Sequence, residues 1–132
     1  MKVSTRGRYA LRLMIYLARC DKDNCIALKE ISEQENVSIK YLEQIVALLC
    51  RAGLVEGIRG SKGGYKLAVE PDQCTVGNVL RITEGSLAPA PCTECNAKCE
   101  RADICSTRDF WRGLQLAIDN YLDSVTIADL AK

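Results

Sequence analysis

The fold of this chain is decided by residues 38–66, SIKYLEQIVALLCRAGLVEGIRGSKGGYK, because this stretch encodes a helix followed by a hairpin. Ser38 is a favourable helix N-cap, and apolar side chains then recur at spacings of three and four, which predicts an amphipathic helix over 38–51. The apolar face consists of Ile39, Leu42, Ile45, Val46 and Leu49, and the opposite arc of Lys40, Glu43, Gln44, Ala47 and Arg51.

The segments on either side of this helix indicate a winged helix-turn-helix. Upstream, a short amphipathic helix over 27–35 and a tight turn complete a helix-turn-helix with 38–51. Downstream, residues 54–59 and 65–69 alternate in polarity around the sequence GSKGG, which predicts two strands joined by a Gly-rich turn. Arg59, Lys62 and Lys66 give this hairpin an expected basic tip. A basic hairpin placed directly after a recognition helix is typical of a wing.

The remaining segments are expected to be mostly helical. Residues 4–18, with Ser4 as the expected N-cap, are apolar on most sides, as in a helix buried on more than one face, and 75–84 form a short helix. The sequence STRD at 106–109 is a capping box that opens a long helix, and TIAD at 126–129 opens a short final one. The apolar stripe of the long helix is wider than one core contact needs, which predicts packing against a second subunit.

The predicted fold class is therefore mainly α with a small β-hairpin. With 132 residues, 48% of them hydrophobic, the chain has room for one domain with a modest core. We expect a winged helix-turn-helix DNA-binding region over 1–73, a short helix and linker over 74–91, a cysteine loop over 92–105, and a dimerisation helix with a short C-terminal helix over 106–132.

Charge is unevenly distributed along the chain. Residues 1–70 carry 12 Lys/Arg and 8 Asp/Glu, a net charge of +4, whereas residues 71–132 carry 6 and 9, a net charge of −3. The basic first half indicates an anionic partner for that half. Histidine is absent, which excludes an imidazole base or ligand, and no nucleophile–base arrangement is visible. We therefore expect neither an enzyme nor a small-molecule substrate.

The sequence contains neither an apolar run of membrane-spanning length nor the pattern of a secretory signal, so a cytoplasmic protein without a membrane partner is expected. Eight cysteines are many for a reducing compartment. Cys50 and Cys74 are interpreted as small apolar core side chains, and Cys20 and Cys25 as incidental. Half of the cysteines fall within residues 92–105.

These four thiols, Cys92, Cys95, Cys99 and Cys105, have the spacing C-x2-C-x3-C-x5-C. Thiolates are soft ligands that favour zinc, copper(I) or iron–sulfur clusters. The spacing matches neither the paired C-x2-C of zinc knuckles nor the standard ferredoxin runs, so it predicts a metal or redox site without naming the metal. A disulfide switch that uses two or three of these thiols remains an alternative.

The DNA-binding hypothesis assigns roles to exposed side chains of the helix and the hairpin. Gln44 suits the paired donor and acceptor of adenine, Lys40 suits guanine or phosphate, and Glu43 suits the amino group of cytosine. Arg59 could enter a narrow minor groove. The predicted DNA-binding set is completed by Arg6, Arg8 and Ser38 as phosphate contacts, and by Tyr41, Gly60, Ser61 and Lys62.

Four segments together resemble the Rrf2 family of bacterial winged-helix regulators, in particular its iron–sulfur cluster regulators of the IscR type. They are STRGRYALRLM, SIKYLEQIVALLCRAGLVEGIRGSKGGYKLA, the cysteine loop and DFWRGLQLAIDNYL. The resemblance implies a homodimer that binds palindromic double-stranded operator DNA, with the long C-terminal helix as dimer interface. It also implies that Glu43 and Gln44 read bases, and that Arg59 probes the minor groove.

For the cysteine loop, the resemblance implies an iron–sulfur cluster on Cys92, Cys99 and Cys105, and a repressor of cluster assembly genes whose operator binding depends on the cluster. The chain departs from the family at the other ligands. Arg108 replaces a histidine ligand, and Arg8 lies where nitric-oxide-sensing relatives use an acidic residue of the partner subunit. Cys95 is the candidate fourth ligand, and four thiolates favour a 2Fe–2S cluster, with 4Fe–4S left open.

Two alternatives remain open. The first is a cluster-free regulator on the same fold, in which the four cysteines bind zinc or form disulfides, because cysteine-metabolism regulators of the family carry no cluster. The second is a small metal-binding or electron-carrier protein without a role on DNA, which leaves the recognition helix and the wing unexplained.

Overall fold

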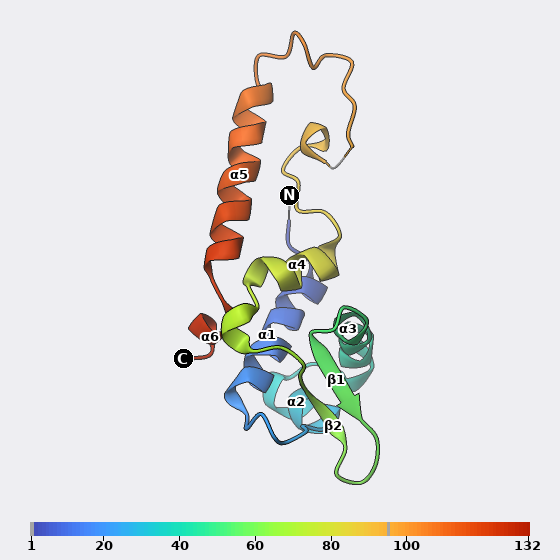
Figure 1. The fold of residues 1–132 in the computed structure, drawn as a ribbon. Coiled ribbons are helices and arrows are strands. Elements are labelled where there is room, and N and C mark those ends of the chain that lie inside the picture. The colour runs from blue at the N-terminus through green and yellow to red at the C-terminus, as the bar shows by residue number, and fades with distance from the viewer. Residues whose placement is uncertain (1, 95) are drawn as a thin grey trace.

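A computed structural model describes residues 2–94 and 96–132. Its elements are α1 (Thr5–Arg19), α2 (Leu28–Glu35), α3 (Ile39–Arg51), β1 (Val55–Ile58), β2 (Gly64–Leu67), α4 (Val76–Glu84), α5 (Arg108–Ser124) and α6 (Ile127–Leu130), with short 3-10 turns at Pro71–Gln73 and Pro91–Thr93. The chain is mainly helical with one antiparallel hairpin, as predicted (Figure 1). Within the described residues, no helix combines the length and apolar character needed to cross a bilayer.

The helix-turn-helix is formed by α2 and α3. Asn36 turns the chain in the left-handed conformation, with φ of 54°, and the Ser32 hydroxyl donates to the Val37 carbonyl at 2.5 Å. Ser38 then caps α3 by accepting a hydrogen bond from the Tyr41 N–H, as predicted. One assignment was wrong: Ile39, expected on the buried face, is 42% exposed because it is the first residue of α3 and lies beyond the core.

One hydrophobic core joins the helix-turn-helix to the middle and the end of the chain. It combines side chains of α1, α2, α3 and β1 with Cys74, Val79 of α4 and Ile127 of α6. Two backbone hydrogen bonds hold the returning end in place, from Ile127 N–H to the Cys74 carbonyl at 2.8 Å and from Val76 N–H to the Val125 carbonyl at 2.9 Å. The C-terminal segment is therefore part of the same packed body as the helix-turn-helix. Cys74 is buried, as predicted, and Cys50 packs at the margin of this core.

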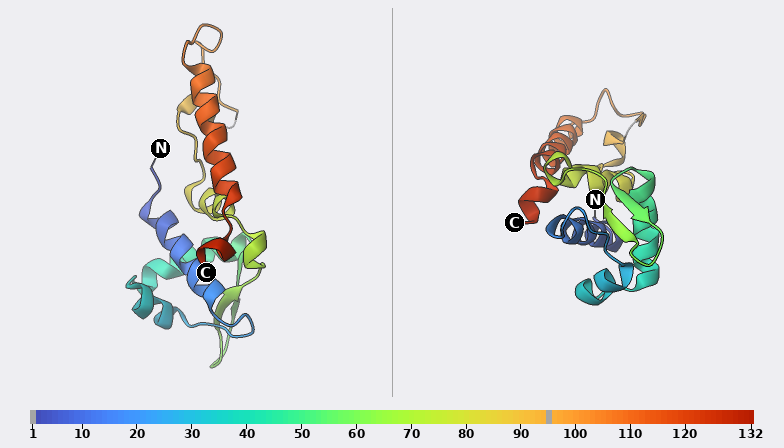
Figure 2. Two further views of the ribbon diagram at one scale, coloured as in Figure 1. Left: turned by 90° about the vertical axis from the view of Figure 1, so that its left-hand side faces the viewer. Right: turned by 60° about the horizontal axis from the view of Figure 1, so that its bottom comes forward.

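The hairpin forms the wing. Val55 pairs with Leu67 and Ile58 with Gly64 in antiparallel register. Ile26 and Tyr65 exchange two backbone hydrogen bonds of 2.8 Å, which fasten the hairpin to the loop after α1. In Figure 1 and in the left-hand view of Figure 2, the tip of the hairpin projects at the end of the molecule opposite the cysteine loop.

Helix α5 extends away from this body along most of its length (Figures 1 and 2). None of its side chains is buried, and only its C-terminal part lies against α4. The predicted capping box at 106–109 was wrong. Thr107, the residue before the helix, has nearly helical backbone angles, and its side chain caps nothing; the hydroxyl lies beside Cys105 instead. By contrast, Thr126 and Asp129 form the predicted capping box of α6.

Candidate nucleic-acid interface and cysteine loop

The predicted base-reading side chains lie on the outer face of α3. Lys40, Glu43 and Gln44 are exposed, while Leu42 and Ile45, on the opposite face, are at most 1% exposed in the core. The buried face anchors α3 in the core, and the exposed polar face is the one that could contact the edges of base pairs.

Two other predicted contacts have structural roles in α3. The Ser38 hydroxyl oxygen accepts from the Tyr41 N–H at 3.2 Å, so it lies at the helix N-terminus, where an anion is favoured. Tyr41 is half-buried, with its ring packed edge-on against Tyr9 at 5.8 Å between centroids. Tyr41 therefore packs α3 against α1, and its role on DNA stays a prediction.

The wing tip presents Arg59, Gly60, Ser61 and Lys62 to solvent. Gly60 has a φ of 115°, a conformation that favours glycine, and its carbonyl accepts from the Gly63 N–H at 3.0 Å. Lys66, also expected at the basic tip, lies within β2 and pairs with Glu56 at 3.4 Å. The free cationic groups of the tip are thus Arg59 and Lys62.

The two arginines at the start of α1 differ in their contacts. Arg6 donates to the Thr83 carbonyl of α4 at 2.6 Å, whereas Arg8 donates to Thr5 within its own helix at 3.1 Å. Both residues are exposed. A guanidinium has five N–H donors, so Arg6 retains donors for a phosphate while it also fastens α1 to α4.

The cysteine loop brings three of its predicted ligands to one place. Cys92, Cys99 and Cys105 line a cavity of about 90 Å³, together with Ala97, Ala102, Arg108 and Arg112. The fourth candidate, Cys95, lies outside the described residues. The first and the last cysteine of the loop thus lie near each other, beside the N-terminus of α5.

The surroundings of Cys105 favour its thiolate. Its Sγ lies 3.4 Å from the Thr107 hydroxyl oxygen, and this hydrogen bond lowers the pKa of the thiol below 9.0, with backbone N–H groups and Arg101 adding to the effect. Arg108 donates to the Ala102 carbonyl at 3.2 Å. Because a guanidinium has no available lone pair, Arg108 closes the loop but cannot act as a metal ligand.

The donor chemistry of this cavity fits a soft metal or an iron–sulfur cluster, since three thiols converge on it. Among the described residues, however, no three Cys, Asp or Glu side chains are close enough together to hold a metal ion.

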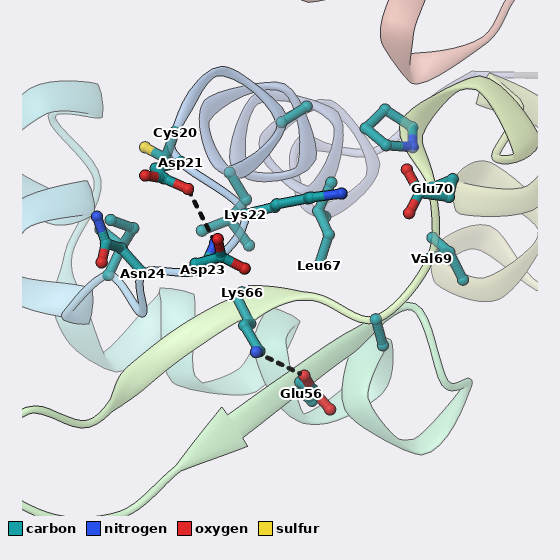
Figure 3. A pocket seen from close by; sticks show the side chains of 15 residues that line it. Cys20, Asp21, Lys22, Asp23, Asn24, Glu56, Lys66, Leu67, Val69 and Glu70 are labelled. Carbon is teal, nitrogen blue, oxygen red and sulfur yellow. Dashed lines mark hydrogen bonds and ion pairs between the residues drawn. The ribbon is translucent and has the colours of Figure 1, made fainter.

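A second pocket, of about 500 Å³, lies at the base of the wing, between the loop after α1 and residues 66–71 (Figure 3). Its lining mixes carboxylates and amines, including a Lys66–Glu56 ion pair of 3.4 Å. Cys20 also lines it, and partial burial, with Glu30 nearby, raises the pKa of the Cys20 thiol. A protonated thiol is a poor nucleophile, in keeping with the interpretation of Cys20 as incidental.

Comparison with known proteins agrees with this fold. Residues 3–132 match the family model Rrf2, described as an iron-dependent transcriptional regulator. The chain is 41% identical to the HTH-type transcriptional regulator CymR of Bacillus subtilis, over 99% of this chain and 90% of CymR. It is 36% identical to the HTH-type transcriptional regulator IscR of Aliivibrio salmonicida, over 98% of this chain and 77% of IscR.

Among solved structures, that of CymR, the global cysteine regulator of B. subtilis, superposes with a TM-score of 0.83 at 42% identity, covering 99% of this chain and 96% of CymR. Matches of this length and identity extend from the helix-turn-helix through α5 to α6. The chain therefore belongs to the Rrf2 family of transcriptional regulators.

Proposed function

We propose that this protein is a homodimeric, sequence-specific DNA-binding regulator whose operator affinity depends on the state of the cysteine loop. The observation that carries this proposal is the convergence of Cys92, Cys99 and Cys105 on one cavity at the start of α5. Because the far end of α5 is joined to the DNA-binding body, a change at these thiols can alter how the helix is held.

The exposed side of α5 supports the homodimer. Phe110 and Tyr121, which are eleven residues apart and therefore lie on the same face of the helix, are 63% and 70% exposed. Large apolar side chains on one extended helix are costly to leave in water, and a second copy of the same helix would cover them symmetrically. A two-fold dimer places two α3 helices at equivalent half-sites, so the operator is palindromic double-stranded DNA.

The regulatory group that fits best is an iron–sulfur cluster, 2Fe–2S with four thiolates, held by Cys92, Cys99 and Cys105 together with Cys95. Such a cluster would supply a redox-active link whose presence depends on the supply of iron and sulfide. Thr107 favours the Cys105 thiolate, and Arg108 closes the loop through the Ala102 carbonyl. Repression of iron–sulfur cluster assembly genes is the regulatory role that matches this chemistry.

The second candidate is a cluster-free regulator in which the same thiols bind zinc or form disulfides. Two observations favour it. The relative described as a global cysteine regulator is 42% identical to this chain. The described cysteines are also not preassembled around a metal ion, which suits the disulfide form of this candidate. In both versions the state of the thiols controls operator binding.

The experiment is anaerobic purification followed by visible absorption spectroscopy and iron, sulfide and zinc assays. About two irons and two sulfides per chain, with charge-transfer bands, are expected for the cluster. Cys99→Ser should abolish these bands, Cys95→Ser should abolish or alter them, and Cys50→Ser, away from the loop, should leave them unchanged. A colourless protein that takes up no cluster on reconstitution would favour the zinc or disulfide version.

A further inference from the structure

Arg81 of α4 forms ion pairs with two carboxylates of α5. Its Nη1 donates to Asp123 Oδ1 at 2.6 Å, and its Nη2 donates to Asp123 Oδ2 and to Asp119 Oδ1 at 3.1 Å each. Gln115 Nε2 extends the row by donating to Asp119 Oδ2 at 3.0 Å. Because residues 115, 119 and 123 are four apart, they form one ridge of α5 that faces α4.

Helix α4 is itself fixed to the DNA-binding body. Val79 and Thr83 are 0% and 1% exposed. At the end of α4, the Glu84 carboxylate accepts from the Ser4 hydroxyl at 2.6 Å, and the Thr83 carbonyl accepts from Arg6 at 2.6 Å. A guanidinium on α4 therefore holds α5 relative to α1 and to the core that carries α3.

The other described contacts between α5 and the body lie at its C-terminal end, where Val76 N–H donates to the Val125 carbonyl at 2.9 Å beside an apolar cluster. Leu122 and Val125 pack against a small cluster of Val76, Leu80 and Leu87. Apolar contacts are non-directional and permit α5 to tilt about them, whereas a two-pronged arginine–carboxylate contact has a preferred geometry. The Arg81 contact, with its directional hydrogen bonds, therefore favours one tilt of α5.

Gly77 provides room for this arrangement. A Cβ atom at position 77 would collide with Asp123 Oδ1 and would lie 2.6 Å from Arg81 Nη1. Only the absence of a side chain at 77 lets the carboxylate and the guanidinium meet directly above α4.

We infer that Arg81 is a positioning residue that selects operator spacing, by setting the angle between the dimerisation helix α5 and the body that carries α3. This inference rests on the proposed function. In a dimer held together through α5, a change of tilt changes the separation and rotation of the two α3 helices. One added base pair rotates one half-site relative to the other by about one-tenth of a turn, so a rigid dimer binds the longer operator weakly. A dimer in which α5 can change its tilt binds the longer operator nearly as well as the original one.

The Arg81 side chain is 38% exposed and that of Asp123 is 49% exposed. Exposed ion pairs contribute little to stability, so removing this one should loosen the angle without unfolding the chain. The Arg12–Glu35 ion pair offers a matched control. Arg12 is 44% exposed, and the pair, at 2.9 Å, joins α1 to α2.

The test begins with an operator selected by the wild-type dimer from a random-sequence DNA library. Affinities are then measured for that operator and for versions with one central base pair added or removed. Wild type should prefer the selected spacing, and Arg81→Met should lower this preference about tenfold. Arg12→Met should leave the preference unchanged. In the Arg81→Met background, Asp123→Asn should add no further change, because the contact is already lost.

An Arg81→Met protein that is folded, by circular dichroism and thermal melting, and that keeps the wild-type spacing preference would overturn the inference. If Arg81→Met does not fold, Gly77→Ala, which keeps every charge, should lower the same preference, and an unchanged preference would again overturn the inference. A wild-type protein that binds DNA without any spacing preference would instead contradict the proposed dimeric operator recognition itself.

Discussion

The carboxylate of Glu84, at the end of α4, accepts hydrogen bonds from both the backbone N–H and the hydroxyl of Ser4, the N-cap of α1, at 3.2 and 2.6 Å. The same Ser4 oxygen accepts from the Gly7 N–H at 3.1 Å. One hydroxyl therefore both caps α1 and joins it to α4 across 80 positions of sequence. The start of α1 is held by tertiary structure as well as by its own cap.

This arrangement predicts an inverted effect for Gly7→Ala. Glycine to alanine inside a helix usually stabilises by about 1 kcal/mol, but here the new Cβ would collide with Glu84 Oε1. We expect a loss of about 1–2 kcal/mol in the free energy of unfolding, the cost of a lost cap, measured by urea denaturation. In a Glu84→Ala background the same change should be neutral or stabilising. A stabilising effect in the wild-type background would contradict the structure.

The contact between Arg81 and Asp123 predicts a pH dependence of stability. The Arg81 hydrogen bonds hold the pKa of Asp123 below its ordinary value of 3.8. A carboxylate whose pKa is lower in the folded state contributes stability above the unfolded pKa and loses it as the pH falls through the folded pKa. The difference in unfolding free energy between wild type and Asp123→Asn should thus be constant from about pH 7 to pH 5 and shrink below about pH 4. A difference independent of pH down to pH 2 would show that Asp123 is unpaired in solution.

If the exposed face of α5 is the dimer interface, a charge introduced on that face should dissociate the dimer. Tyr121→Asp should convert the dimer to a monomer, because burying a carboxylate in an apolar interface is costly. Sedimentation equilibrium should show the molar mass fall by half. Gln34→Asp, which adds the same charge on an exposed position of α2, should leave the dimer intact. A dimer that survives Tyr121→Asp would place the interface elsewhere.

The polar arc of α3 predicts separable effects on DNA binding. Gln44→Ala should relax the preference at one base pair and cost about 1–3 kcal/mol for the preferred operator. Lys40→Ala, if Lys40 contacts phosphate, should weaken all sequences similarly and reduce the salt dependence of binding. Competition binding with single-base variants of the operator measures both. An unchanged preference in Gln44→Ala would contradict the assignment of α3 as the recognition helix.

Much of this fold could be predicted from local sequence, because its signals are local. The caps Ser4, Ser38 and Thr126 act on backbone groups three residues away and lie where the sequence predicts them. The same rule was wrong at Ser106, since α5 begins one residue later and the Thr107 side chain lies beside Cys105 instead of capping the helix. No local pattern signals that Arg81 meets Asp123, 42 positions later.

In the candidate site, too, local features could be predicted from the sequence and long-range contacts could not. Thiol spacing predicts a metal or redox loop, and the structure brings Cys92, Cys99 and Cys105 to one cavity. The sequence does not predict the second role of Arg6, whose contact with the Thr83 carbonyl depends on the packing of α4 against α1. Long-range contacts of this kind follow from the assembled fold.

The central claim is that the state of the cysteine loop controls operator binding. Its most direct test is to titrate one operator with anaerobically purified protein, and with the same protein after iron and zinc have been removed by chelation. The two forms should differ in affinity by about fivefold or more, and Cys99→Ser should show no difference between the two treatments. Equal affinities of the two wild-type forms would contradict the account.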